Sequence, residues 1–70
     1  MRVITSPMAG TVSRVLVQEG ETVSPGQDVL MLESMKMEIA VQAEVGGTVK
    51  ITRVSEGEFV DEGAVLFELE

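Results

Sequence analysis

The chain contains no cysteine, histidine, tryptophan or tyrosine, and only two phenylalanines. Without cysteine, neither disulfides nor thiolate metal sites can stabilise it, and without histidine the usual protease and zinc chemistries lack their parts. Lys and Arg number 5 against 12 Asp and Glu, which gives a formal net charge of -7. This charge would repel a phosphate backbone, and no aromatic platform for bases is available. We therefore expect no nucleic-acid partner.

Long apolar runs are missing as well. No segment approaches the roughly 20 apolar residues needed to span a bilayer, and the start MRVITSPMAG lacks the apolar centre of a signal peptide. We therefore expect a cytoplasmic location and no membrane insertion. Phosphate-binding loops of the types GxxxxGKS/T and GxGxxG do not occur. The acids are scattered through turns, which is typical of a solvated surface and not of a catalytic acid–base pair.

An internal repeat organises the 70 residues, which are predicted to form one domain, 1–70. Residues 8–33 align with 45–70 without a gap at an offset of 37, and extension backwards gives the halves 1–33 and 38–70. Eleven positions are identical: Gly10/Gly47, Thr11/Thr48, Val12/Val49, Val17/Val54, Glu19/Glu56, Gly20/Gly57, Glu21/Glu58, Val23/Val60, Gly26/Gly63, Leu32/Leu69 and Glu33/Glu70. Only residues 34–37 have no counterpart.

Each half has the residue choice of a β structure. Val, Ile and Thr occur in runs of strand length between glycines, and the motif Glu-Gly-Glu-x-Val-x-x-Gly at 19–26 and 56–63 predicts two closely spaced turns around a buried Val. Val12 and Val17 are apolar in both copies but lie five residues apart, so a bulge or corner is expected between them. We predict an all-β flattened barrel or sandwich of two antiparallel sheets, with an internal pseudo-twofold axis.

Comparison of the copies also predicts which side chains are buried. Leu30 and Leu32 align with large apolar residues of the second copy and are expected in the core. Met31 lies between them and aligns with Glu68, so its side of the strand is expected to face water.

The four residues without a counterpart join the two copies. The first copy ends in a predicted strand at 28–33 and the second begins with one at 38–43, so 34–37 should be the exposed tight turn of a β-hairpin. The pseudo-twofold relation places the chain termini near the opposite end. Lys36 is therefore expected at a tip, where it is presented to whatever the domain meets.

Lys36 also has unusual neighbours. A lysine in a turn is ordinarily plain surface, but Met35 and Met37 on either side offer a soft apolar contact to a partner. The other lysine of the chain, Lys50, replaces Ser13 in a mid-strand position. A primary amine can form an amide with an activated carboxylate, and at an exposed tip a partner enzyme must supply that acyl group and a base. Lys36 thus has the features of a substrate for a modifying enzyme.

The motif ESMKME at 33–38, with SPMAGTV at 6–12 and EGETVSPGQDVLMLE at 19–33, resembles the biotinyl domain of biotin-dependent carboxylases and decarboxylases. The resemblance covers essentially the whole chain. It implies the barrel-sandwich fold of biotinyl and lipoyl domains, and covalent biotin on Lys36, attached by biotin protein ligase from biotinyl-adenylate. Biotin would then shuttle carboxyl groups, as carboxybiotin, between biotin carboxylase and carboxyltransferase sites on other domains or subunits.

The resemblance also assigns the residues beside the lysine. Met35 and Met37 match the flanking methionines of the family and are expected to serve ligase recognition or carboxyl transfer, and Glu33, Ser34 and Glu38 are further expected ligase contacts. The domain itself would be a monomeric cofactor carrier and not an enzyme. Its acidic surface suggests that partner docking sites are basic or neutral.

Two features separate this chain from parts of the wider family. Acetyl-CoA carboxylase carriers of many bacteria have an inserted thumb in the first half, and the gapless repeat leaves no room for one, so the resemblance is to the thumbless type or to a free-standing attachment protein. In lipoyl domains the lysine is typically preceded by Asp and followed by Ala, which the methionines here do not match. A lipoyl-type acyl carrier and an unmodified β interaction module remain as alternatives.

Overall fold

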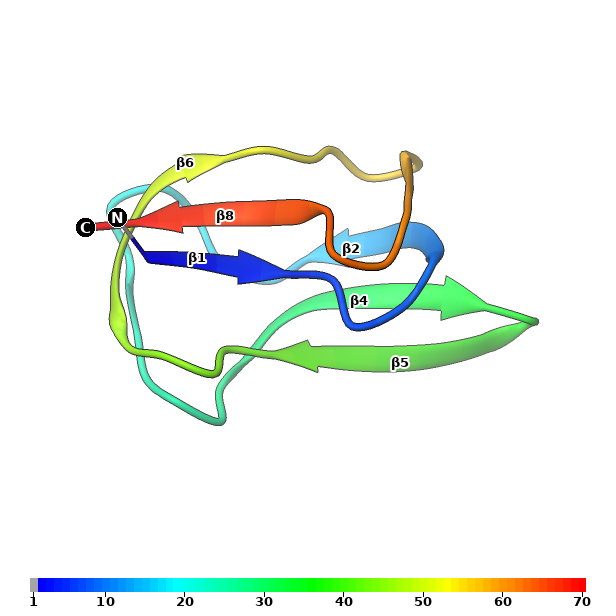
Figure 1. Ribbon diagram of the computed structural model, residues 1–70, viewed down its shortest axis with the longest axis horizontal. Coiled ribbons are helices and arrows are strands. Elements are labelled where there is room, and N and C mark those ends of the chain that lie inside the picture. The colour runs from blue at the N-terminus through cyan, green and yellow to red at the C-terminus, as the bar shows by residue number, and fades with distance from the viewer. Residues whose placement is uncertain (1) are drawn as a thin grey trace.

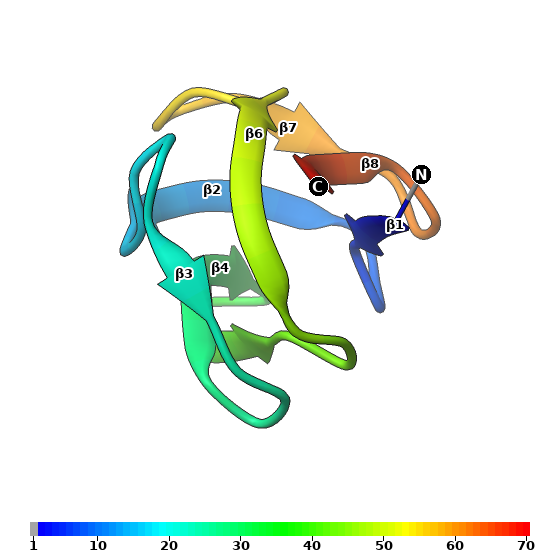
Figure 2. The same ribbon diagram turned by 90° about the vertical axis from the view of Figure 1, so that its left-hand side faces the viewer.

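The computed structural model describes residues 2–70 and consists of eight β-strands in two four-stranded sheets, with no helix in that range. All strand pairs within residues 2–70 are antiparallel. The first sheet has the order β1 (Arg2–Thr5), β8 (Val65–Leu69), β6 (Gly47–Thr52), β3 (Thr22–Val23). The second has the order β5 (Met37–Gln42), β4 (Asp28–Ser34), β2 (Gly10–Val15), β7 (Phe59–Val60). The predicted all-β fold of two antiparallel sheets is confirmed (Figures 1 and 2).

The two sheets are copies of each other in strand order. Strands β2 and β6 are 37 residues apart, as are β3 and β7, and replacing each strand by its counterpart turns one sheet into the other. Each sheet takes two strands from each half of the sequence, so the halves are interlaced and do not form separate layers. The sequence predicted that the two halves close on each other. It did not predict that they exchange strands between the two sheets.

The core has the same twofold pattern. The buried apolar side chains fall into pairs 37 residues apart: Ile4/Val41, Val12/Val49, Val17/Val54, Val23/Val60, Val29/Leu66, Leu30/Phe67 and Leu32/Leu69. Ala43 is also buried, and its counterpart is Ser6, whose hydroxyl donates a hydrogen bond to the Met8 carbonyl at 2.6 Å. The buried status predicted for Leu30 and Leu32 is confirmed.

A bulge interrupts each long strand at the expected place. Where β2 pairs with β4, Val12 faces Leu32 but Arg14 faces Met31, so Ser13 is an extra residue; Lys50 is the equivalent extra residue in β6. The bulge resets the alternation and leaves two successive residues exposed, Ser13 and Arg14.

One burial prediction is wrong. Met31 is half-buried, and its counterpart Glu68 is only 6% exposed, although both were expected to face water. Glu68 lies on β8, a central strand of its sheet, and the Nε of Arg53 donates a hydrogen bond to its carboxylate. The partly exposed Arg53 side chain thus shields this carboxylate from solvent while pairing with it.

The two Glu-Gly-Glu turns connect the halves through matching hydrogen bonds. Gly20 N–H donates to the Val49 carbonyl and Gly57 N–H to the Val12 carbonyl, each at 2.7 Å. Both glycines have positive φ, 92° and 90°, which glycine adopts without steric cost. Each turn therefore docks on a strand of the other half.

Candidate functional site

The site lies at the end of the β4–β5 hairpin, at the opposite end of the molecule from the start of β1 and the end of β8 (Figure 1). The two strands pair from Asp28 and Gln42 up to Ser34 and Met37. The connection is therefore the two residues Met35 and Lys36, shorter than the four predicted, because the ladder extends one residue further on each side. The tip is therefore separated from the start of β1 and the end of β8, as the pseudo-twofold relation predicts.

Both turn residues have left-handed backbone conformations. The φ angles are 54° at Met35 and 65° at Lys36, which is the pattern of a type I′ turn. This turn suits the twist of a hairpin but favours Asn and Gly, because a Cβ in the left-handed region costs roughly 1–2 kcal/mol. The long β4–β5 ladder and its buried side chains hold Met35 and Lys36 in this strained turn.

The turn exposes both methionines and the lysine. Met35 is 92% exposed and Met37 is 63% exposed, and Lys36 is exposed between them. Within residues 2–70, the one ion pair joins Arg53 to Glu68, so no carboxylate of this part of the chain holds the Lys36 ammonium group. The amine thus projects from a rigid two-stranded arm and is accessible to a partner.

The three remaining predicted residues lie directly behind the turn. Glu33 and Glu38 face each other across the β4–β5 ladder, and both are exposed. Ser13 Oγ donates to Glu38 Oε1 at 3.0 Å and so ties the carboxylate to β2. Ser34 is half-buried and pairs with Met37. Like charges directly opposite are unfavourable in a sheet, so this end combines turn strain with repulsion between Glu33 and Glu38.

The acids of the Glu-Gly-Glu motifs have a structural function that the sequence analysis missed. Glu19 Oε2 accepts a hydrogen bond from Thr52 N–H at 2.9 Å, and Glu56 Oε2 accepts one from Val15 N–H at 3.3 Å. These two contacts are 37 residues apart and cross between the halves. The duplication of the motif was the available signal, since it marks acids that recur at one structural position.

No group of three or more Asp, Glu, His or Cys within residues 2–70 could hold a metal ion.

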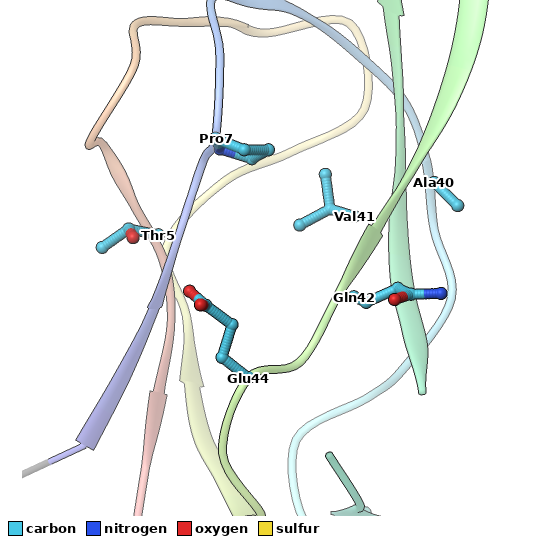
Figure 3. Close-up of a pocket in the computed structure, with 6 residues that line it drawn as sticks. All are labelled: Thr5, Pro7, Ala40, Val41, Gln42 and Glu44. Carbon is cyan, nitrogen blue, oxygen red and sulfur yellow. The ribbon is translucent and has the colours of Figure 1, made fainter. Parts of the chain in front are cut away.

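A cavity of about 240 Å³ lies away from the hairpin tip, between β5 and the segment from the end of β1 to Pro7. Figure 3 shows the Val41 and Glu44 side chains on the side that faces Thr5 and Pro7. Thr5 and Gln42 are equivalent residues of the two halves, as are Pro7 and Glu44, because each pair is 37 residues apart. The cavity is therefore lined by equivalent residues from both halves and lies where the halves meet. Lys36 does not line it.

One exposed residue of this sheet was not singled out from the sequence. Phe59 on β7 is 62% exposed, whereas Phe67 is fully buried. The available signal was again the repeat, because the counterpart of Phe59 is the polar Thr22.

Comparison with known proteins places this geometry in a family. Residues 2–69 match the biotin/lipoyl family described as "Biotin-requiring enzyme". The chain is 47% identical to the biotin/lipoyl attachment protein of Bacillus subtilis over 94% of this chain and 90% of that protein. It is 44% identical to the biotin carboxyl carrier protein of acetyl-CoA carboxylase from Solanum lycopersicum, over 94% of both chains.

A solved structure gives the same result for the fold. Kluyveromyces lactis urea carboxylase superposes with a TM-score of 0.89 at 25% identity, over 99% of this chain but 6% of that enzyme. The chain therefore corresponds to a small part of that multidomain enzyme. It belongs to the biotin/lipoyl family of cofactor-carrying domains.

In the described structure the connections β2–β3 and β6–β7 have equal lengths, as expected for a member without a thumb. No helix of the described chain is long and apolar enough to cross a membrane.

Proposed function

We propose that this domain carries biotin on Lys36 and shuttles carboxyl groups between the two active sites of a biotin-dependent carboxylase. Its relatives include biotin carboxyl carrier proteins and parts of carboxylases, so the domain is a carrier of a covalently bound cofactor and not itself the catalyst. The observation that supports Lys36 as the attachment residue is its place at the tip of a two-residue turn, held at a fixed φ by a rigid hairpin.

The residues of the tip fit an amide-linked cofactor. Attachment needs an accessible primary amine and open space around it, and Lys36 lies exposed between Met35 and Met37. In the ligase, Lys36 Nζ would attack the acyl carbon of biotinyl-adenylate, lose a proton to a base of the ligase and release AMP. When bound, biotin supplies the transferable carboxyl group.

The rest of the domain positions and moves the attached group. Its core and interlaced sheets make the base of the arm rigid, while the long lysine side chain gives the arm reach. A tethered carrier raises the local concentration of the group at each site that its tether can reach. The biotin protein ligase, the biotin carboxylase and carboxyltransferase sites, the cytoplasm as location and a monomeric domain are all parts of this proposal.

Lipoylation of Lys36 is the alternative that the family membership itself raises, because the B. subtilis relative is described as a biotin/lipoyl attachment protein. The methionines on both sides of the lysine favour biotin, since they match the flanking residues of biotinyl domains and not those of lipoyl domains.

The test is the intact mass of the domain after coexpression with a biotin protein ligase and free biotin. We expect one biotinyl group per wild-type chain and none on the Lys36→Arg variant, which keeps the charge but loses the nucleophile. In a parallel sample with lipoate and a lipoate ligase, we expect no mass increase. Labelling at Lys50, or a lipoyl increment without a biotinyl one, would refute the proposal.

A further inference from the structure

The sulfur atoms of the described chain divide between the interior and the hairpin tip. Met8 and Met31 are partly buried, and Met8 packs against the hydrophobic core. Met35 and Met37, in contrast, are 92% and 63% exposed. A dissolved oxidant must touch a thioether to oxidise it, so exposure favours the reaction. The two methionines beside Lys36 are therefore the ones that such an oxidant reaches first.

The fold does not depend on the side chains of these two methionines. Met35 and Met37 belong neither to the buried core nor to the residues that pack against it. The turn is held instead by the β4–β5 ladder, which extends from Asp28 and Gln42 to its end at the tip. A sulfoxide is polar and would disrupt a core, but at a solvated tip it stays hydrated. Oxidation at the tip can therefore change its chemistry without unfolding the domain.

The position of the pair makes such a change matter for Lys36. Met35 precedes the lysine within the two-residue turn, and Met37 follows it as the first residue of β5. An enzyme that brings Lys36 Nζ to an activated acyl group must therefore admit both methionines beside it. The thioethers enter as soft apolar groups, whereas sulfoxide oxygens must first lose their hydration. Oxidised methionines should thus hinder the approach of the amine.

We propose that Met35 and Met37 form a reversible oxidation site that controls the attachment of the cofactor to Lys36. This inference rests on the proposed function, and it assigns to the two thioethers a chemistry of their own. The unmodified domain accepts the cofactor when both sulfur atoms are reduced. It accepts the cofactor slowly when they are sulfoxides, although the fold and the lysine are unchanged.

The oxidant of this site is hydrogen peroxide, and each sulfur reacts with one molecule of it. A lone pair of the sulfur attacks one peroxide oxygen, so the S–O bond forms while the O–O bond breaks. The proton on the transferred oxygen passes to the departing hydroxide, which leaves as water. The sulfur loses two electrons and the peroxide gains them. Methionine sulfoxide reductases reverse the change, one enzyme for each sulfoxide epimer, while two thiols are oxidised to a disulfide and water is released.

The first part of the test locates the oxidation. The full unmodified chain is treated with increasing hydrogen peroxide, the peroxide is destroyed with catalase, and the product is analysed by intact mass and peptide mapping. We expect oxygen on Met35 and Met37 before Met8 or Met31, with Met35 first because it is the more exposed of the tip pair. Oxidation of Met8 or Met31 ahead of the tip would overturn the inference.

The second part measures biotinylation of the same samples by a purified biotin protein ligase. We expect kcat/KM to fall about tenfold when both tip methionines are sulfoxides, and to recover after treatment with both reductases and a thiol. The urea midpoint of the oxidised chain should match that of the untreated chain. The matched control is the variant Met35→Leu with Met37→Leu, which keeps apolar side chains but lacks both sulfur atoms. Its kcat/KM should be the same before and after peroxide.

The remaining outcomes separate this inference from the proposed function. An unchanged kcat/KM with both sulfoxides present would overturn the inference and leave biotinylation of Lys36 intact, whereas an untreated chain that takes no biotin would refute the proposed function itself. An equal loss in the leucine variant, a lowered urea midpoint or no recovery with the reductases would also overturn the inference. If the double variant does not fold, Met35→Leu and Met37→Leu are used singly, and each should lose less kcat/KM than the wild type after peroxide.

Discussion

Lys36 and Met35 occupy a turn that their side chains do not favour. Both have positive φ, in a type I′ turn that usually contains Asn and Gly. Met35 is also 92% exposed, so it gains almost no burial in return. A residue whose backbone conformation costs stability and whose side chain contributes to no core contact is expected to serve recognition, which agrees with the proposed role of the tip.

Replacement of Met35 by Asn should make the domain more stable. Asn tolerates the left-handed conformation, and the exposed methionine has little packing to lose, so the free energy of unfolding should rise by about 0.5–1 kcal/mol. Urea denaturation of the unmodified domain measures this change. The same variant should be biotinylated more slowly than the wild type, because one flanking methionine is gone.

Met37→Asn is the matched control for this prediction. Met37 lies in β5, paired with Ser34, and is not among the residues with positive φ. Asn is a poor strand residue, so no gain in stability is expected. Equal stability changes in the two variants, or a loss in Met35→Asn, would show that turn strain is not what distinguishes position 35.

At this scale the sequence could locate the lysine but not its conformation. The unpaired joint of the repeat was visible in the alignment, whereas Met and Lys carry no signal for a type I′ turn. The turn is set by the long ladder behind it and not by local preference. Glu68 is a similar case, since its burial depends on pairing with Arg53 in space.

At the scale of elements, the Glu-Gly-Glu turns link the two halves. The first Glu of each motif reaches the backbone at the end of a long strand of the other half: Glu19 binds Thr52 N–H and Glu56 binds Val15 N–H. The second Glu closes its own turn, through Gln18 N–H to Glu21 and Ser55 N–H to Glu58, each at 3.1 Å. Acids that composition alone would assign to the solvated surface thus terminate strands and fix turns.

Removal of one link should weaken the domain measurably. We expect Glu19→Ala to lower the free energy of unfolding by about 1 kcal/mol, because the Thr52 N–H loses its hydrogen-bond acceptor. Glu62→Ala is the control, since the Glu62 carboxylate makes no hydrogen bond within residues 2–70, and its effect should stay within about 0.5 kcal/mol. Thermal or urea unfolding checks both. A Glu19→Ala variant as stable as Glu62→Ala would mean that water replaces the carboxylate without loss.

The strands themselves were largely predictable, including the bulge. Val12 and Val17 required a break in alternation, and the structure supplies it at Ser13. The ends of the hairpin strands were placed one residue short, because Ser34 and Met37 have no repeat counterpart to indicate their pairing.

At the scale of the whole molecule, the interlacing of the halves was beyond the reach of the sequence. The repeat shows which residues are equivalent, but it does not show which strands of the two halves pair. In the structure β8 lies between β1 and β6, and its counterpart β4 lies between β5 and β2. Each sheet is then completed by strands of the other half.

This architecture separates the hairpin tip from the chain termini. The β4–β5 hairpin forms one end of the long axis, and the start of β1 and the end of β8 lie at the other (Figure 1). The molecule measures 32 × 19 × 18 Å along its principal axes, so the long axis is the direction in which the tip projects. A partner can therefore reach the tip without meeting the start of β1 or the end of β8.

The position of the lysine within the turn is the central claim of this account, and moving the lysine tests it most directly. Two variants shift it by one residue: Met35→Lys with Lys36→Met, and Met37→Lys with Lys36→Met. The measurement is the intact mass of each variant after coexpression with a biotin protein ligase and biotin. We predict complete biotinylation of the wild type and strongly reduced biotinylation of both variants, because the turn would direct the amine differently. Near wild-type labelling of both shifted lysines would contradict the account.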